Sequence, residues 1–128
     1  AAASAVTGVL TDPYSGDVVS FVSGPDTSVL VQIDHVVALA WAWHHGADGW
    51  SDQRRLEFAN DQRNLRAASE AMNQSKGASG PADWLPPDPG QHCDYVVSFI
   101  ETLDRWELGV DLREKRAMHE ILTWCETG

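Results

Sequence analysis

Four polar residues in the first 75 positions carry side chains that could together hydrolyse a bond with the help of a metal ion. Asp34 and His35 are adjacent, and Asn64 and Asn73 follow. A carboxylate binds a hard divalent cation such as Mg²⁺ or Mn²⁺, and a neighbouring His stays available as a general base. We expect Asn64 to orient His35 by accepting from one ring nitrogen. The amide oxygen of Asn73 would be a second ligand to the ion.

Each of these residues also has an ordinary structural interpretation. Asp34 could cap a helix that begins at Val36, and His35 could be a hydrogen-bonded residue at the end of a strand. Asn64 and Asn73 belong to a residue type that is common in turns and caps. The two interpretations differ in whether the four side chains converge.

The overall charge opposes binding of nucleic acid. The chain has 128 residues and a net charge of −10, with 9 Lys and Arg against 19 Asp and Glu. Binding of phosphates normally needs a basic surface. Residues 54–76 are the exception, because they hold five basic and three acidic side chains. We therefore expect contacts to substrate phosphates from three cations of this window, namely Arg63, Arg66 and Lys76.

The predicted elements that position these residues indicate an α+β domain with a small antiparallel β-hairpin core. Turn residues at Asp12–Gly16 separate two short apolar runs and predict a hairpin. A third apolar run over Val29–Ile33 predicts a strand that ends at the Asp-His pair. A short helix over Glu70–Lys76 would carry Asn73 toward the same place.

Further helices are expected to surround this core. One runs from Val36 to His45, and Ser51 caps another that reaches about Asn60. Beyond a Gly- and Pro-rich loop, two stretches have apolar residues at positions i, i+3, i+4 and i+7. They predict a helical hairpin that turns at Gly109 and closes the domain.

The two cysteines lie at the ends of this hairpin. Cys93 opens its first helix and Cys125 closes the second, so antiparallel helices bring the two sulfurs to the same end. We favour a disulfide, and the alternative is a pair of buried free thiols. Closing this loop would contribute about 3–4 kcal/mol. A disulfide would also imply an oxidising compartment, and hence a secreted protein.

Trp41 and Trp43 are interpreted as packing residues rather than as a platform on which nucleobases stack. Stacking aromatic residues are expected beside a basic groove. Residues 1–53 contain no Lys or Arg, and Arg54 and Arg55, which follow, are expected on a solvated helix face. We therefore expect both tryptophans to be buried in the core.

Five short motifs occur in one order along the chain. They are Asp12–Gly16, Asp34–Leu39, Asn60–Leu65, Asn73–Gly77 and Pro81–Pro86. In this order they resemble the HNH, or ββα-metal, nucleases. The match is closest to the secreted actinobacterial nucleases and the GmrSD-type C-terminal domains of restriction enzymes, whose members also carry a cysteine pair.

The resemblance implies a role for each of the four polar residues. His35 would be the general base, Asn64 the residue that orients it, and Asp34 and Asn73 the metal ligands. Such an all-oxygen site favours one Mg²⁺ or Mn²⁺ over zinc. The implied activity is metal-dependent endonuclease cleavage of DNA, with RNA left open, at low sequence specificity. The alternative is a non-catalytic acidic binding module that keeps the nuclease scaffold.

The chain departs from the family pattern at its start. Residues 1–5 stand where members carry an additional N-terminal segment, so we expect this segment to be absent and the terminus to be flexible or trimmed. We expect a single domain over residues 1–128. No apolar run approaches the roughly 20 residues of a membrane span, so no membrane partner is expected.

Overall fold

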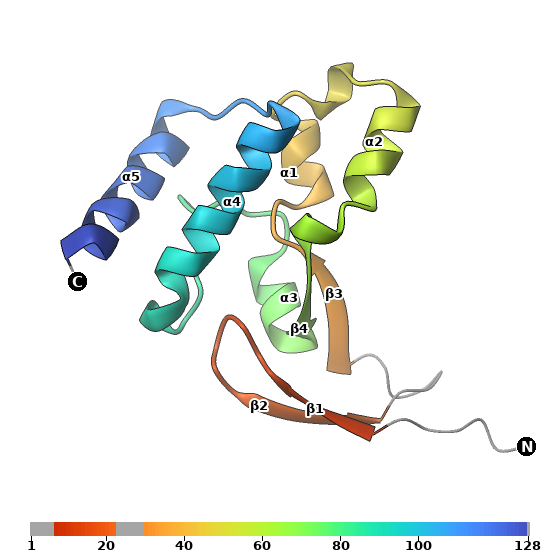
Figure 1. Cartoon of the computed structure of the whole chain (residues 1–128), viewed down its shortest axis with the longest axis vertical. Coiled ribbons are helices and arrows are strands. Elements are labelled where there is room, and N and C mark those ends of the chain that lie inside the picture. Colours follow the sequence, from red (N-terminus) through yellow and green to blue (C-terminus); the bar gives the residue numbers. More distant parts are fainter. Residues whose placement is uncertain (1–6, 23–29, 128) are drawn as a thin grey trace, which may run out of the picture.

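The computed structural model describes residues 7–22 and 30–127, and within them it is an α+β structure with two small antiparallel sheets. The strands are β1 (Thr7–Thr11), β2 (Val18–Val22), β3 (Val31–His35) and β4 (Leu65–Ser69). The helices are α1 (Leu39–Trp43), α2 (Asp52–Ala59), α3 (Glu70–Lys76), α4 (His92–Trp106) and α5 (Leu112–Thr127). Figure 1 shows α1, α2, α4 and α5 gathered at one end, the β1–β2 hairpin at the other, and β3, β4 and α3 between them. The predicted fold class is confirmed, while residues 1–5 and the expected strand start at Val29 lie outside the described residues.

The predicted N-terminal hairpin is confirmed. Strands β1 and β2 pair from Thr7 with Val22 to Thr11 with Val18. The turn between them closes through backbone hydrogen bonds from Gly16 to Asp12 and from Asp12 to Asp17, at 3.0 and 2.8 Å. Gly16 has a φ of +79°, a conformation that suits glycine. The turn buries the ring of Tyr14 completely.

Strands β3 and β4 form the platform of the site. They are antiparallel, with Asp34 opposite Arg66 and Gln32 opposite Ala68. Because side chains alternate along a strand, these four residues share one face of the sheet. The helix α3 packs against both strands, and the Ser69 hydroxyl caps its first turn (Figure 1). The chain therefore has the β-β-α arrangement that the family resemblance implied, with α3 at the expected residues.

Helix α1 begins later than predicted. Its N-cap is Ala38, and Val36 and Val37 precede it in a non-helical segment. Both valines are buried in the core, at 1% and 0% exposure. Asp34 therefore does not cap this helix, and the structural alternative for its role is wrong.

The core is rich in aromatic residues. Trp41 is 5% exposed and meets the ring of Phe99 edge to face at 5.1 Å, which confirms that it is a packing residue. Trp43 is 47% exposed, so its assignment to the core is wrong. No helix within the described ranges is long and apolar enough to cross a membrane.

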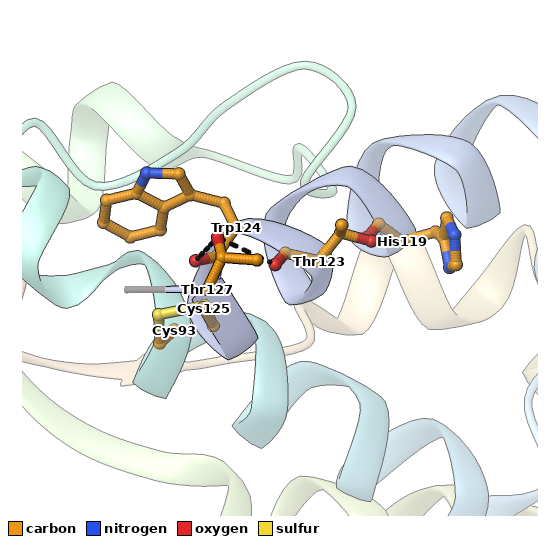
Figure 2. Close-up of a disulfide and its surroundings, with 6 residues drawn as sticks. All are labelled: Cys93, His119, Thr123, Trp124, Cys125 and Thr127. Carbon is orange, nitrogen blue, oxygen red and sulfur yellow. Dashed lines mark hydrogen bonds between the residues drawn. A yellow bond between two sulfur atoms is a disulfide. The ribbon is translucent and has the colours of Figure 1, made fainter.

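The predicted disulfide joins the two C-terminal helices. Figure 2 shows Cys93, at the start of α4, bonded to Cys125, in the last turns of α5. The two Cα atoms are 5.8 Å apart, and 32 positions separate the cysteines in the sequence. The alternative of two free thiols is therefore wrong.

Removing this disulfide is expected to lower the free energy of unfolding by about 3–4 kcal/mol, because the bond restricts the unfolded chain. The measurement is urea denaturation of the Cys93→Ala, Cys125→Ala double variant without reductant. Dithiothreitol should lower the stability of the wild type by a similar amount and leave the double variant unchanged. Equal stabilities of oxidised wild type and double variant would contradict the prediction.

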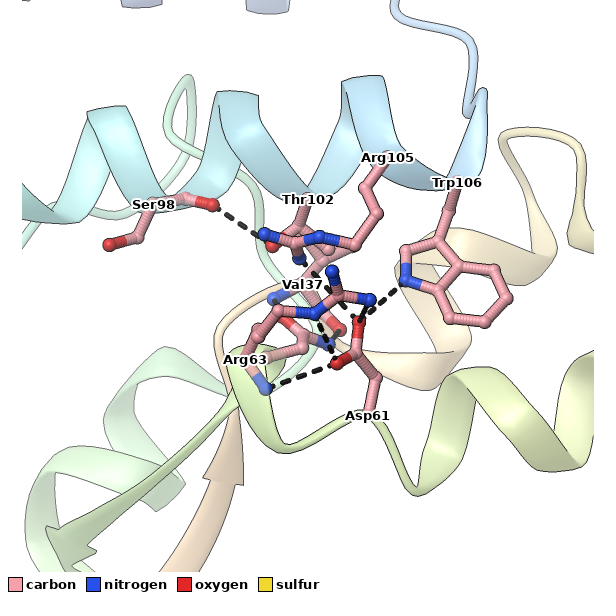
Figure 3. Close-up of polar contacts among 8 residues, drawn as sticks. Val37, Asp61, Arg63, Ser98, Thr102, Arg105 and Trp106 are labelled. Carbon is pink, nitrogen blue, oxygen red and sulfur yellow. Dashed lines mark hydrogen bonds and ion pairs between the residues drawn. The ribbon is translucent and has the colours of Figure 1, made fainter.

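Asp61 holds a short 3₁₀ turn, Gln62–Asn64, against α4 (Figure 3). Its carboxylate accepts from the backbone N of Arg63 at 3.1 Å and from the side-chain Nε at 2.9 Å. The indole Nε1 of Trp106 donates to the other oxygen at 2.8 Å. Burial alone would raise the pKa of Asp61, but these donors outweigh it and lower the pKa to about 2.

The low pKa of Asp61 predicts a loss of stability in acid. The folded state binds this proton less readily than the unfolded state, whose pKa is near 3.8, so the carboxylate stabilises the fold above that pH. The contribution, about 2 kcal/mol, should disappear as the pH falls from about 4 to about 2. Chemical denaturation across this range should show the wild type converging on Asp61→Asn. Asp17 is exposed, so Asp17→Asn is the control. A difference in unfolding free energy between the wild type and Asp61→Asn that stayed constant over this pH range would refute the prediction.

Candidate active site

At the end of β3, the side chains of Asp34 and His35 point to opposite faces of the sheet. Asp34 is 4% exposed and lies on the face that α3 covers. His35 is half-buried, and its ring reaches the last residue of α2. The two adjacent residues therefore have separate surroundings.

The imidazole of His35 is held through one nitrogen. Its Nε2 lies 2.9 Å from the carbonyl oxygen of Ala59. Because a carbonyl can only accept, the neutral ring carries its proton on Nε2 and keeps a lone pair on Nδ1. No other residue in the described part of the chain makes a hydrogen bond to this ring. The ring is thus oriented with Nδ1 as its basic atom.

Asn64 makes no hydrogen bond to the His35 ring, so the predicted hydrogen bond between them is wrong. The side chain is fully buried, and it accepts from the Val37 backbone N at 2.9 Å and donates to the Val37 carbonyl at 3.0 Å. The backbone oxygen of Asn64 also accepts from Val36 N at 2.8 Å. Asn64 therefore fixes the backbone that directly follows His35, and the ring is oriented by Ala59.

The carboxylate of Asp34 has two partners from distant parts of the chain. Lys76 Nζ lies 3.1 Å from one oxygen and also donates to the carbonyl of His35 at 2.8 Å. The hydroxyl of Tyr14 donates to the other oxygen. Burial lowers the pKa of Lys76, although Asp34 opposes this shift, and burial followed by the charge of Asp34 raises the pKa of Tyr14.

Tyr14 is a site residue that the sequence analysis missed. It lies in the turn after β1, where Asp12 accepts from the backbone N of Tyr14 and of Ser15, at 3.2 and 2.7 Å. The other oxygen of Asp12 accepts from Ser69 N, at the end of β4, at 2.9 Å. Asp12 thus docks the turn against the second sheet and brings Tyr14 to Asp34. The available signal was the Asp-Pro-Tyr-Ser-Gly motif, which we interpreted as a turn and as one of the five family motifs without giving Tyr14 a role.

Asn73 lies on the face of α3 that looks toward β3. Its Nδ2 donates to Oε1 of Gln32 at 2.7 Å. Gln32 and Asp34 share a face of β3, and Asn73 and Lys76 are one helical turn apart on α3. Within residues 7–22 and 30–127, Oδ1 of Asn73 has no hydrogen-bond partner. The sequence analysis also missed Gln32, although its position two residues before Asp34 puts both side chains on the same face of a strand.

The oxygen donors on this face fit a hard divalent cation. Asp34 has one donor at each oxygen and keeps further lone pairs, and the Oδ1 of Asn73 is free to bind. Among the described residues, no group of three or more His, Cys, Asp and Glu could hold a metal. Mg²⁺ often binds to one or two carboxylates and completes its shell with water and substrate phosphates. Carboxylate and amide oxygens are the ligand type that hard divalent cations prefer.

The cations predicted to bind phosphates are all engaged within the protein. Arg63 pairs with Asp61, yet its side chain is 63% exposed. Arg66 lies 3.8 Å from Asp94 and is 20% exposed. The side chain of Lys76 is completely buried, so it does not reach the surface as a phosphate contact would, and it neutralises Asp34 instead.

Comparison with known proteins identifies the family. The chain is 36% identical over 124 residues to an "Uncharacterized secreted protein" of Arthroderma benhamiae. The match covers 95% of this chain but only 58% of that relative. No solved structure is significantly similar to the chain. Residues 3–121 match the family described as "GmrSD restriction endonucleases, C-terminal domain", and the chain belongs to this family.

Proposed function

We propose that the protein is a metal-dependent endonuclease that hydrolyses phosphodiester bonds, with DNA as its main substrate. The observation that carries the proposal is the hydrogen bond between His35 Nε2 and the Ala59 carbonyl, which leaves Nδ1 as an oriented base on the residue that directly follows the buried Asp34. Membership of a restriction endonuclease family supports a nuclease-related function. RNA is the second substrate class to be tested.

In the proposed mechanism, Nδ1 of His35 takes a proton from the attacking water, whose oxygen bonds to phosphorus as the bond from phosphorus to the leaving 3′-oxygen breaks. The Ala59 carbonyl keeps the ring in the required tautomer and orientation. Asn64 fixes the backbone after His35, and so acts on the base indirectly. Asp34 and Asn73 would hold one Mg²⁺ or Mn²⁺, which when bound would neutralise charge on the scissile phosphate and the leaving 3′-oxygen.

The remaining basic side chains supply only a weak attraction for a polyanion. We propose Arg63 and Arg66 as phosphate contacts, because both side chains reach the surface. Their ion pairs with Asp61 and Asp94 reduce the positive charge that they present. Substrate binding should therefore be weak and should fall steeply with salt.

An extracellular location is supported by two observations. The protein holds a disulfide between Cys93 and Cys125, which persists in oxidising compartments. The fungal relative is named a secreted protein. An enzyme in that location would meet nucleic acid outside the cell.

Conversion of supercoiled plasmid to the nicked form tests the proposed function. We expect nicking with Mg²⁺ or Mn²⁺ and none after EDTA is added, because the chemistry needs a divalent cation. Cleavage of single-stranded DNA and of RNA under the same conditions ranks the substrates. Absence of cleavage on every substrate with every divalent cation would refute the enzyme and favour a non-catalytic binding module.

Loss of a proposed ligand is expected to weaken binding of Mn²⁺ by at least about tenfold, since loss of a residue that only supports a ligand already costs about 10–100-fold. Asp34→Asn and Asn73→Ala each remove one oxygen donor, and isothermal titration calorimetry measures the affinity. Gln74→Ala is the matched control, since Gln74 is exposed on the same helix. Circular dichroism verifies that each variant is folded. Unchanged affinity in Asn73→Ala would remove Asn73 from the ligand set.

A further inference from the structure

A small recess opens between α1 and α2, next to the proposed general base. Its volume is about 160 Å³. Trp43 and Leu39 form its rim and are 47% and 46% exposed, while Phe58 lies at its base with 2% exposure. The other lining residues are Ala42, Ala47, Trp50, Arg55 and Ala59. The recess therefore combines an open, aromatic rim with a buried apolar floor.

The recess and His35 share a residue. Ala59 lines the recess, and its carbonyl oxygen is the atom that holds His35 Nε2 at 2.9 Å. Leu39, on the rim, follows His35 by four positions, at the start of α1. A ligand in the recess would thus contact Ala59, the residue whose carbonyl holds the ring of the proposed base.

The fold also brings a cation to the rim. The guanidinium of Arg55 lies 5.3 Å from the centre of the Trp43 ring. It is fixed there by hydrogen bonds to the carbonyls of Ala47 and Trp50, at 3.1 and 2.6 Å. Arg55 is therefore not a solvated side chain as predicted, because it packs against the indole of Trp43 and against backbone carbonyls.

Arg54 also differs from the expectation of a solvated side chain. Its guanidinium lies 4.6 Å from the centre of the Trp50 ring and 5.0 Å from that of Trp106. It also donates to the Trp106 carbonyl at 3.0 Å. The sequence analysis argued against a stacking platform because residues 1–53 contain no basic residue. That argument fails in the folded chain, because α2 places Arg54 and Arg55 against the aromatic side chains.

The size and lining of the recess match one planar ring. A cavity of about 150 Å³ lined by apolar side chains is known to hold a benzene ring. Nucleobases stack on aromatic side chains whatever their identity, because every base has a π face. Such a contact suits an enzyme of low sequence specificity.

We propose that this recess is a nucleobase subsite, in which one base of the substrate strand next to the scissile phosphate stacks on Trp43. The inference rests on the proposed nuclease function, because it places the substrate at His35. It adds a contact that is independent of charge, which an acidic protein with few free cations needs. The occupant is a base of a strand that is locally unpaired, since a base within a duplex is already stacked.

Steady-state cleavage of single-stranded oligonucleotides tests the subsite with Trp43→Leu, which keeps an apolar side chain but removes the ring. We expect KM to rise about tenfold, the order of effect of one lost stacking contact. Trp43→Phe keeps a ring and should restore most of the affinity. Trp124→Ala is the matched control, because Trp124 is 53% exposed on α5 and lines no part of the recess.

Abasic substitutions in the oligonucleotide give a second readout, which leaves the fold of the protein unchanged. Removing the one base next to the cleaved bond should raise KM for the wild type about tenfold and have no further effect in Trp43→Leu, since the two changes delete the same contact. Additive effects of the two changes, or a KM for Trp43→Leu equal to that of the wild type, would overturn the subsite.

Failure of the subsite and failure of the nuclease are distinguishable. If the wild type cleaves nothing, the proposed function fails, and fluorescence anisotropy of a labelled oligonucleotide then tests the recess alone. Binding about tenfold weaker in Trp43→Leu than in the wild type would retain the subsite. Equal binding, or no binding by the wild type, would refute it.

Discussion

Replacing His35 by alanine is expected to lower kcat for phosphodiester cleavage by about 10²–10⁴-fold, the usual contribution of a general base. The variant removes Nδ1, the only ring atom that is oriented as a base. Asp34 and Lys76 lie on the opposite face of the sheet and should be undisturbed. Cleavage of a fluorogenic oligonucleotide under saturating Mg²⁺ or Mn²⁺ measures the change.

Two comparisons separate loss of the base from loss of the fold. His44→Ala replaces an exposed histidine of the same region and should retain full activity. Free imidazole added to His35→Ala should restore part of the rate, because it can occupy the vacated space and accept the proton. Urea denaturation should show similar stabilities for both variants. A kcat for His35→Ala within about threefold of the wild type would exclude general base catalysis by this residue.

Replacing Lys76 by methionine is expected to lower the free energy of unfolding by about 3–5 kcal/mol, because it leaves a buried carboxylate without its counter-charge. Methionine keeps most of the apolar volume, so the loss reports the ion pair rather than a cavity. The side chains of Lys76 and Asp34 are 0% and 4% exposed. Urea denaturation near neutral pH gives the value.

The matched control for this ion pair is Lys115→Met, at an exposed position on α5, which should change stability little. The double variant Lys76→Met, Asp34→Asn should be more stable than Lys76→Met alone, because it removes the unpaired charge. If Lys76→Met were as stable as Lys115→Met, Asp34 would not depend on Lys76 for its charge balance.

Local patterns in the sequence predicted the local elements well. Helix α3 needs only Ser69 as a cap and a run of helix-forming residues, and it lies where the sequence placed it. The disulfide followed from the apolar spacing of two consecutive helices. The start of α1 was misjudged because Val36 and Val37 continue an apolar pattern, although their backbone groups bond to Asn64 instead of forming a helical turn.

Side-chain partners across long stretches of sequence could not be predicted. Asp34 meets Tyr14 across 20 positions and Lys76 across 42. Asn64 belongs to a turn next to β4, so its reach to Val37 depends on the pairing of β3 with β4. Nothing in the amino-acid pattern indicated that Ala59 would hold His35, because the contact uses a backbone carbonyl that any residue offers.

The hydrogen bond between Asp12 and Ser69 has a consequence for the order in which the protein folds. It closes a loop of 57 positions, whereas the disulfide joins residues only 32 apart within one helical hairpin. The entropy lost on closing a loop grows with its length, and helical contacts form faster than pairings between distant segments. The C-terminal hairpin can therefore form and oxidise before Tyr14 reaches Asp34. The covalent bond can then be in place while the contacts around Asp34 are still incomplete.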